Sequence, residues 1–167
     1  MLIREKVGHV AGIHINHLQK DALHIEWFDA AKRIQRLRTQ SGCEVAIKFL
    51  QEGQRLEDGD ILYMDDTTAI VVHIVPCDAI VIQPKDMLEM GTVCYEIGNK
   101  HLPIFLQEDE VLIPYEEPLF RWLQAAGFAP AKAVRQLRNM LKSNVTPHSH
   151  GTSANTLFSR IMNLASK

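Results

Sequence analysis

The first half of the chain alternates apolar and polar positions with a period of two, which is typical of β-strands. Leu23, Ile25 and Trp27 share one side of such a pattern. Further short apolar runs, separated by polar turns, lie at residues 33–39, 43–49, 61–64, 69–75 and 79–82. The turn Gln40-Ser41-Gly42 predicts a hairpin between two of them. Many short strands of this kind predict a small β-sandwich or barrel-like domain.

The pattern changes to a helical period after Pro84. Met87, Met90, Cys94 and Ile97 recur at steps of three, four and three, so they share one face of a helix. Proline suits a first helical turn, so the helix is expected over residues 84–97. Gly98 is expected to supply the left-handed residue that ends the helix.

The remaining apolar runs predict a strand at 102–107, a strand at 111–115 and a helix at 118–126. Residues 131–137 fit either a strand or a helix. Together with the strand at 79–82, this order is β-α-β-β-α-β, a ferredoxin-like arrangement. The predicted fold class is therefore α+β. An N-terminal β domain covers residues 1–76, and a ferredoxin-like domain covers residues 77–142.

Residues 143–167 form a predicted flexible tail, because residues 143–155 read SNVTPHSHGTSAN, which is polar and contains proline and glycine. Residues 156–165 fit a short amphipathic helix and a frayed end equally well.

Composition and charge exclude several classes of function. The chain has 167 residues, 46% of them hydrophobic, and a net charge of −2. Without a basic excess, neither nucleic acid nor an anionic membrane is an expected partner. No apolar run approaches the length of a membrane span, and charges interrupt the N-terminus where a signal peptide needs an apolar run. Three widely spaced cysteines without a CxxC pair fit buried thiols in the cytoplasm.

Histidines carry the candidate chemistry. His101 follows the predicted helix and precedes Pro103, which places its imidazole at an exposed corner. His148 and His150 lie two residues apart, so both imidazoles can close on one metal ion. Neutral nitrogen ligands suit Ni²⁺, Cu²⁺ and Zn²⁺, and the ligands alone do not single out one of these metals. The other histidines are interpreted as surface or structural residues: His9, His14, His17, His24 and His73.

Residues 95–103, YEIGNKHLP, carry a resemblance that extends over most of the chain. Matching pieces occur in the same order and spacing as far as Leu123: Glu26-Trp27, VAIK at 45–48, GDILY at 59–63 and IPY at 113–115. The sequence resembles the UreE family of urease accessory proteins, which are cytoplasmic nickel metallochaperones.

The resemblance implies a homodimer that passes Ni²⁺ to the urease accessory GTPase and the apo-urease complex. It places His101 at the dimer interface, where two copies form a pair of ligands that one histidine cannot supply. With only His148 and His150, the tail resembles the minimal kind in the family. Some members carry a further histidine pair where this chain has Tyr115 and Glu117, so that extra site is expected to be absent.

Two other functions remain open from the residues alone. A metal-dependent hydrolase needs a carboxylate base near the metal, and Glu96 is the nearest candidate in sequence. A metal-independent module would use the β domain to bind a peptide. No P-loop, HExxH or GxSxG motif is present, so an enzyme is not the favoured interpretation.

Overall fold

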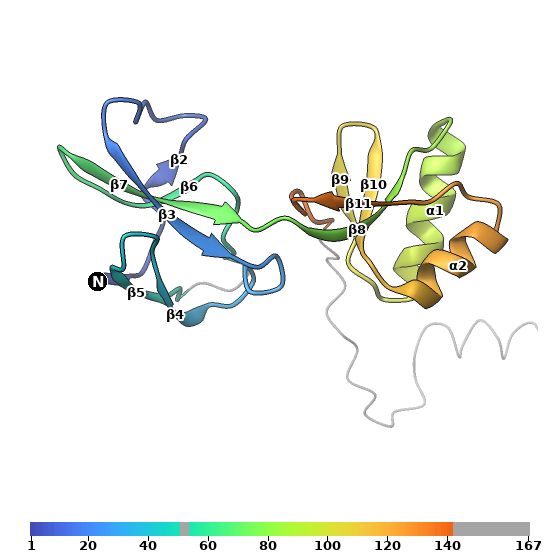
Figure 1. Cartoon of the computed structure of the whole chain (residues 1–167), viewed down its shortest axis with the longest axis horizontal. Coiled ribbons are helices and arrows are strands. Elements are labelled where there is room, and N and C mark those ends of the chain that lie inside the picture. The colour runs from blue at the N-terminus through green and yellow to red at the C-terminus, as the bar shows by residue number, and fades with distance from the viewer. Residues whose placement is uncertain (51–53, 142–167) are drawn as a thin grey trace, which may run out of the picture.

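The computed structural model describes residues 1–50 and 54–141 (Figure 1). His148, His150 and the stretch 156–165 lie outside these residues. The N-terminal half (residues 1–76) contains the strands β1 (Leu2–Ile3), β2 (Gly8–His9), β3 (Gln19–Ile25), β4 (Ile34–Arg38), β5 (Glu44–Lys48), β6 (Asp60–Met64) and β7 (Thr68–Ile74). The C-terminal half contains β8 (Cys77–Ile82), α1 (Met87–Asn99), β9 (Phe105–Gln107), β10 (Glu110–Pro114), α2 (Glu117–Ala125) and β11 (Ala131–Arg135).

The N-terminal half is a sandwich of two sheets, with strand orders β1-β5-β4 and β2-β6-β7-β3. The predicted hairpin is present as the antiparallel pair β4–β5, and Gly42 in its turn has a φ of 93°. Alternate residues of each sheet point inward and form one apolar core between the sheets, as the period-two pattern predicts. Its members include Ile3, Leu23, Ile25, Val45, Ile47, Leu62, Ile70, Val72 and Ile74.

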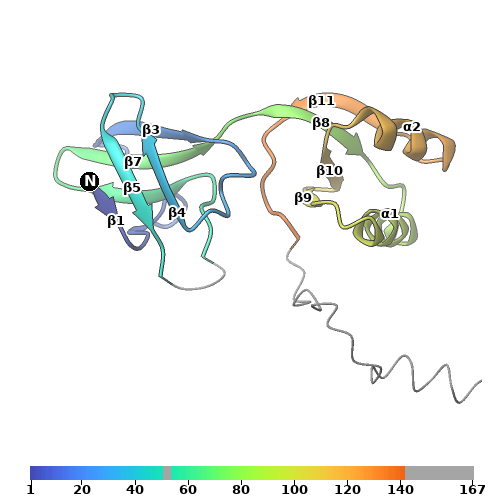
Figure 2. The same cartoon turned by 90° about the horizontal axis from the view of Figure 1, so that it is seen from below.

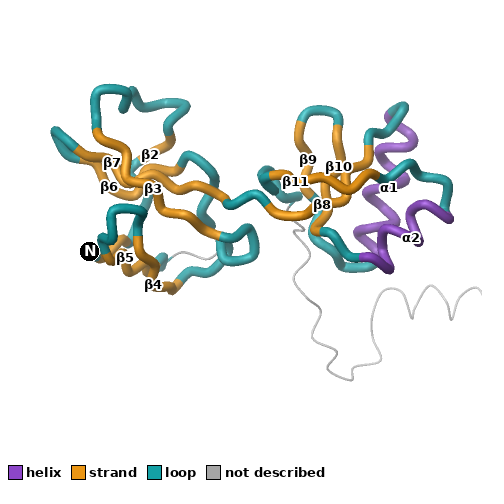
Figure 3. Tube along the Cα trace, in the orientation of Figure 1, coloured by secondary structure: helices purple, strands orange, loops and turns teal. Residues whose placement is uncertain are grey.

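The C-terminal half is ferredoxin-like, as the sequence predicts: β8, α1, β9, β10, α2 and β11 form one sheet of order β11-β8-β10-β9. Both helices cover the same side of this sheet (Figure 3). Val93 and Ile97 of α1 and Leu123 of α2 pack on Ile80 and Ile113 there. The undecided run at 131–137 is a strand that pairs antiparallel with β8.

The other side of this sheet contacts the N-terminal half. The segment after β11 runs between the two halves, and the extended chain from β7 into β8 joins them (Figure 2). Leu137 packs there with Phe105, and the Trp27 ring meets the Phe105 ring edge-on with the centroids 5.6 Å apart. Trp27 lies beyond the end of β3 at Ile25, so it is a contact between halves and not the strand residue that the alternation predicts.

The boundaries predicted for α1 are wrong at both ends. The helix begins at Met87 because the Asp86 carboxylate caps it, accepting a hydrogen bond from Glu89 N at 2.8 Å. Glu89 in turn accepts from Lys85 N at 2.7 Å. At the other end the helix runs to Asn99, and Gly98 is not left-handed. That conformation falls on His101, whose φ is 56°.

Neither α1 nor α2, the two helices of the described part, is long and apolar enough to cross a membrane. All three cysteines are free and half-buried.

Candidate metal centre

His101 occupies the corner where α1 turns into the segment leading to β9. The helix ends in a tight turn, in which His101 N donates to Gly98 O at 2.9 Å and Lys100 N donates to Ile97 O at 3.0 Å. The left-handed φ of 56° is unusual outside glycine, although histidine is among the residues that tolerate it. This turn directs the chain away from the helix and leaves His101 exposed. The predicted exposed corner is therefore present.

The imidazole of His101 is free to act as a ligand. Among the residues that the structure describes, none forms a hydrogen bond with its ring. A neutral imidazole nitrogen is a good donor for nickel, copper and zinc. Within residues 1–50 and 54–141, however, no three histidine, cysteine, aspartate or glutamate side chains gather as a metal site. The donor fits such an ion chemically, and further ligands have to come from elsewhere.

Lys100, the neighbour of His101, is held against α2. Its Nζ atom lies 4.0 Å from the centroid of the Trp122 ring, a cation–π contact. The Lys100 ammonium group would repel a metal cation. The contact holds this group against the second helix.

An exposed stripe leads along α1 to His101. Leu88 and Tyr95 are 80% and 69% exposed. Gly91 lies between Leu88 and Tyr95 on the same face of the helix, and Gly98 follows Tyr95 on that face. A Cβ atom at either glycine would meet no atom within 4 Å. Large exposed apolar side chains on one face of a helix are typical of an interaction surface. This stripe is not among the features predicted from the sequence, although positions 88, 91, 95 and 98 have the period of a second helix face.

The last described residues lie beside the segment that follows His101. Leu141 N donates to Ile104 O at 2.8 Å, and Leu106 N donates to Asn139 O at 3.2 Å. Met140 and Phe105 form an antiparallel bridge between these two bonds. The last described residue, Leu141, therefore pairs with Ile104, which is only three positions after His101.

Tyr115 and Glu117 bind each other. The Tyr115 hydroxyl donates to Glu117 Oε2, and Arg121 Nε donates to Glu117 Oε1 at 2.7 Å. The hydrogen bond to the Glu117 carboxylate raises the pKa of Tyr115. The same bond, together with Arg121, lowers the pKa of Glu117. Both side chains are thus engaged in a network at the surface.

The other histidines have separate positions. His14 and His17 are exposed, as expected of surface residues. His9 is instead half-buried and structural, because its Nε2 lies 2.8 Å from Asp58 O and its Nδ1 accepts from Ala11 N at 3.0 Å. His24 and His73 face each other across paired strands, with ring centroids 5.3 Å apart.

Comparison with known proteins gives a consistent result over the whole chain. Residues 3–75 match the family described as UreE urease accessory protein, N-terminal domain. Residues 78–155 match the corresponding C-terminal domain family.

Three curated relatives, each named urease accessory protein UreE, span a range of similarity. The protein of Flavobacterium johnsoniae is 54% identical over 165 residues, which cover 99% of both chains. The protein of Acetivibrio thermocellus is 37% identical over 92% of this chain and 99% of its own. The protein of Actinobacillus pleuropneumoniae is 45% identical over 78% of this chain and 70% of its own. With two matching domain families and a full-length relative at this identity, the chain belongs to the UreE family of urease accessory proteins.

Proposed function

We propose that this protein is a cytoplasmic nickel metallochaperone that acts as a homodimer in urease maturation. It holds Ni²⁺ through His101 of both subunits together with His148 and His150, and passes the ion to the urease accessory GTPase and the apo-urease complex. Residues 77–142 bind metal and form the dimer, residues 143–167 add ligands, and residues 1–76 contact partners. The observation that carries this proposal is the exposed imidazole of His101, which bonds to no described residue and lies at the end of an exposed helix face.

The helix face supports the dimer. A two-fold interface brings each residue near its own copy if that residue lies close to the axis. Burying Leu88 and Tyr95 against a second α1 would remove two large apolar side chains from water, which favours association. Gly91 and Gly98 would allow the two helices to approach closely. His101, at the end of the same face, would then meet its symmetry mate.

The tail histidines are within reach of the same ion. His148 is seven residues beyond Leu141, a length of at most about 25 Å when extended. Leu141 pairs with Ile104, which is three residues from His101. His148 and His150 can therefore supply nitrogen donors to the His101 ion, and a set of exposed ligands suits an ion that has to be released. Closed structural sites retain their metal instead.

The direct test is a calorimetric titration of the metal-free protein with nickel chloride. Wild type is expected to bind at least one ion per two chains, and His101→Asn should lose that site. Asparagine accepts the left-handed backbone conformation, so this variant removes the ligand with little backbone strain. His14→Asn, at an exposed histidine outside the centre, is the matched control. Unchanged nickel binding by His101→Asn would refute the proposed centre.

Removing the tail should weaken nickel binding and leave the rest of the protein folded. A chain that ends at Lys142 retains both apolar cores and the α1 stripe but loses two proposed ligands. We expect lower affinity or stoichiometry in calorimetry, with unchanged circular dichroism and an unchanged dimer in sedimentation. Double substitution of His148 and His150 by asparagine in the full chain should reproduce the loss. Wild-type affinity in both variants would exclude the tail from the centre.

Nickel binding should weaken as the pH falls, because only a neutral imidazole nitrogen ligates metal. For an ordinary imidazole, the neutral fraction drops roughly twofold between pH 7.5 and 6.5. Affinity should therefore fall roughly threefold for two imidazole ligands and roughly tenfold for four. Competition titrations at these two pH values would count the ligands. Equal affinities would contradict coordination by histidine.

A further inference from the structure

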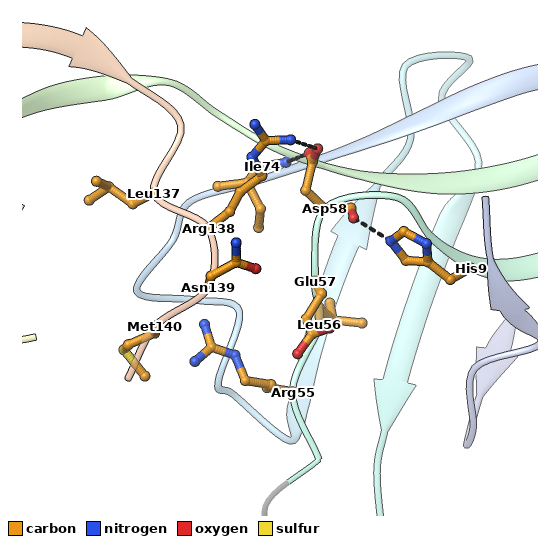
Figure 4. Close-up of a pocket in the computed structure, with 10 residues that line it drawn as sticks. All are labelled: His9, Arg55, Leu56, Glu57, Asp58, Ile74, Leu137, Arg138, Asn139 and Met140. Atoms are coloured by element: carbon orange, nitrogen blue, oxygen red, sulfur yellow. Dashed lines mark hydrogen bonds and ion pairs between the residues drawn. The ribbon is translucent and has the colours of Figure 1, made fainter. Parts of the chain in front are cut away.

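A pocket of about 220 Å³ lies where the two halves meet, and His101 is not among the residues that line it. We call it the junction pocket (Figure 4). The segment 55–58 of the N-terminal half forms one wall, and the segment 137–140, which follows β11, forms the other. Half-buried Met140 contributes apolar surface to the lining, and Leu56, Ile74 and Leu137 are buried beneath it. The nickel centre proposed above makes no use of these residues.

Arg55 is the distinctive group in the junction pocket. Its side chain extends from one wall towards the segment that carries Asn139 and Met140 (Figure 4). The Nε atom is buried and has no hydrogen-bond partner among the described residues. In the described part of the chain, the guanidinium forms no ion pair either, although Arg55 O accepts from Lys6 Nζ at 3.2 Å. Arg55 as a whole is half-buried, and a bound acceptor would give its buried Nε atom a hydrogen-bond partner.

The other charged groups of the pocket leave Arg55 uncompensated. The Asp58 carboxylate accepts from Ile74 N at 2.9 Å, and it lies 3.7 Å from Arg138 Nη1. His73 Nδ1 also lies 3.4 Å from the Asp58 carboxylate. Glu57 also lines the pocket, but it is exposed, so water screens its charge.

Arg138 and Asn139 add donors on the opposite wall. Arg138 is held in place from its Nε atom, which donates to Gln107 Oε1 at 3.1 Å. The left-handed turn at Asn139, with a φ of 57°, presents a side-chain amide that binds no described residue. Arg138 is already engaged with Asp58 and Gln107, so Arg55 and the Asn139 amide are the groups suited to a further acceptor that carries negative charge.

We propose that the junction pocket binds the carboxylate of an acidic ligand, with Arg55 as its principal contact and Asn139 as the second. The volume is below that of a typical pocket for a drug-sized molecule, so it suits a group the size of one or two amino-acid residues. The apolar lining would receive the aliphatic part of that group. The carboxylate belongs either to an acidic protein segment or to a free small dicarboxylate. Because both walls contribute, the ligand would also hold the two halves together.

The test uses the full chain without metal, so its result is independent of the nickel proposal. The probes are glutarate, the peptide acetyl-alanyl-leucyl-glutamic acid amide, and the same peptide ending in glutamine amide. Binding is measured by calorimetry at low salt and mapped by amide chemical shifts. We expect the glutamate peptide or glutarate to bind, with shifts on both segments 55–58 and 137–140, and the glutamine peptide to bind at least about tenfold more weakly.

Variants decide whether the pocket is responsible. Arg55→Gln should weaken binding by at least about tenfold, whereas Arg55→Lys should keep part of it. Arg36→Gln, at an exposed arginine on β4, should bind as wild type does. If Arg55→Gln fails to fold, Asn139→Asp serves instead, because it keeps the shape and the left-handed turn but places a repelling carboxylate in the pocket.

If the glutamate peptide binds and glutarate does not, the ligand is a segment of a protein partner. If glutarate binds as tightly as the peptide, the ligand is a free dicarboxylate. Either result supports the proposal if the binding is lost in Arg55→Gln or in Asn139→Asp. The proposal is overturned if neither acidic probe binds wild type, if the glutamine peptide binds equally well, or if the variants bind normally.

Discussion

Nickel is expected to tighten the proposed dimer about a hundredfold in wild type and to leave its stability unchanged in the His101→Asn variant. An ion that bridges two His101 side chains binds the dimer and not the monomer. A ligand that binds one state alone stabilises that state by about 2.7 kcal/mol at a hundredfold excess over its Kd. That free energy corresponds to about a hundredfold in the dimer dissociation constant. Sedimentation over a dilution series, with and without Ni²⁺, measures it.

His14→Asn is the control for this experiment, since His14 is also exposed but lies far from α1 in the sequence. It should show the full nickel effect. Ions bound by His148 and His150 within one chain give no such coupling, so the comparison separates the interface ion from a tail ion. If His101→Asn retains the tightening, another group bridges the subunits. If the wild-type dimer is too tight to dissociate, a nickel-dependent rise in Tm that vanishes in His101→Asn replaces the measurement.

Phe105→Ala is expected to lower the free energy of unfolding by about 3–5 kcal/mol, the usual cost of deleting a buried phenylalanine ring. Phe105 is fully buried between the ferredoxin-like sheet and the contact with the N-terminal half. Its loss leaves a cavity under Leu137 and removes the edge-on contact with Trp27. Urea denaturation gives the change in stability. Trp27 fluorescence, read in a Trp122→Phe background, reports the contact between the halves.

Phe28→Ala is a matched control for this prediction. The Phe28 ring also lies edge-on to Trp27, with centroids 5.5 Å apart, but Phe28 is 54% exposed. Its removal should change stability by less than about 1 kcal/mol. Equal effects of the two substitutions would mean that contact with Trp27, and not burial beneath the sheet, is what Phe105 contributes.

Much of the fold follows from periodicity. The hairpin β4–β5 and the order of elements in the ferredoxin-like half are predicted because each element buries one face against its own neighbours. The boundaries of α1 are not predicted by periodicity, because the start of the helix depends on one capping side chain. Asp86 competes with Pro84 as a start signal, and the observed Asp86–Glu89 bond decides the competition. At the C-terminal end, Gly98 can adopt either conformation, and the helix continues through it.

The candidate centre is predictable only in part. His101 stands in a recognisable motif, and its exposed corner follows from the helix before it and Pro103 after it. Contacts between distant segments carry no local signal. Nothing near Trp27 in the sequence indicates that it meets Phe105, and nothing near Arg55 indicates that Arg138 and Asn139 line the same pocket. The alternation around Trp27 even predicts a strand that ends two residues too late.

The pairing of residues 139–141 beside β9 has a consequence for the protein in solution. In the described sheet, β9 is one of the two edge strands. Leu106 N on this strand donates to Asn139 O, and Leu141 N donates to Ile104 O just before the strand. An uncovered outer strand offers a row of donors and acceptors to the same strand of another molecule, which is a common route to aggregation. These three residues act as a cover for that edge. A chain cut before Asn139 would expose it, whereas a chain ending at Lys142 keeps it closed.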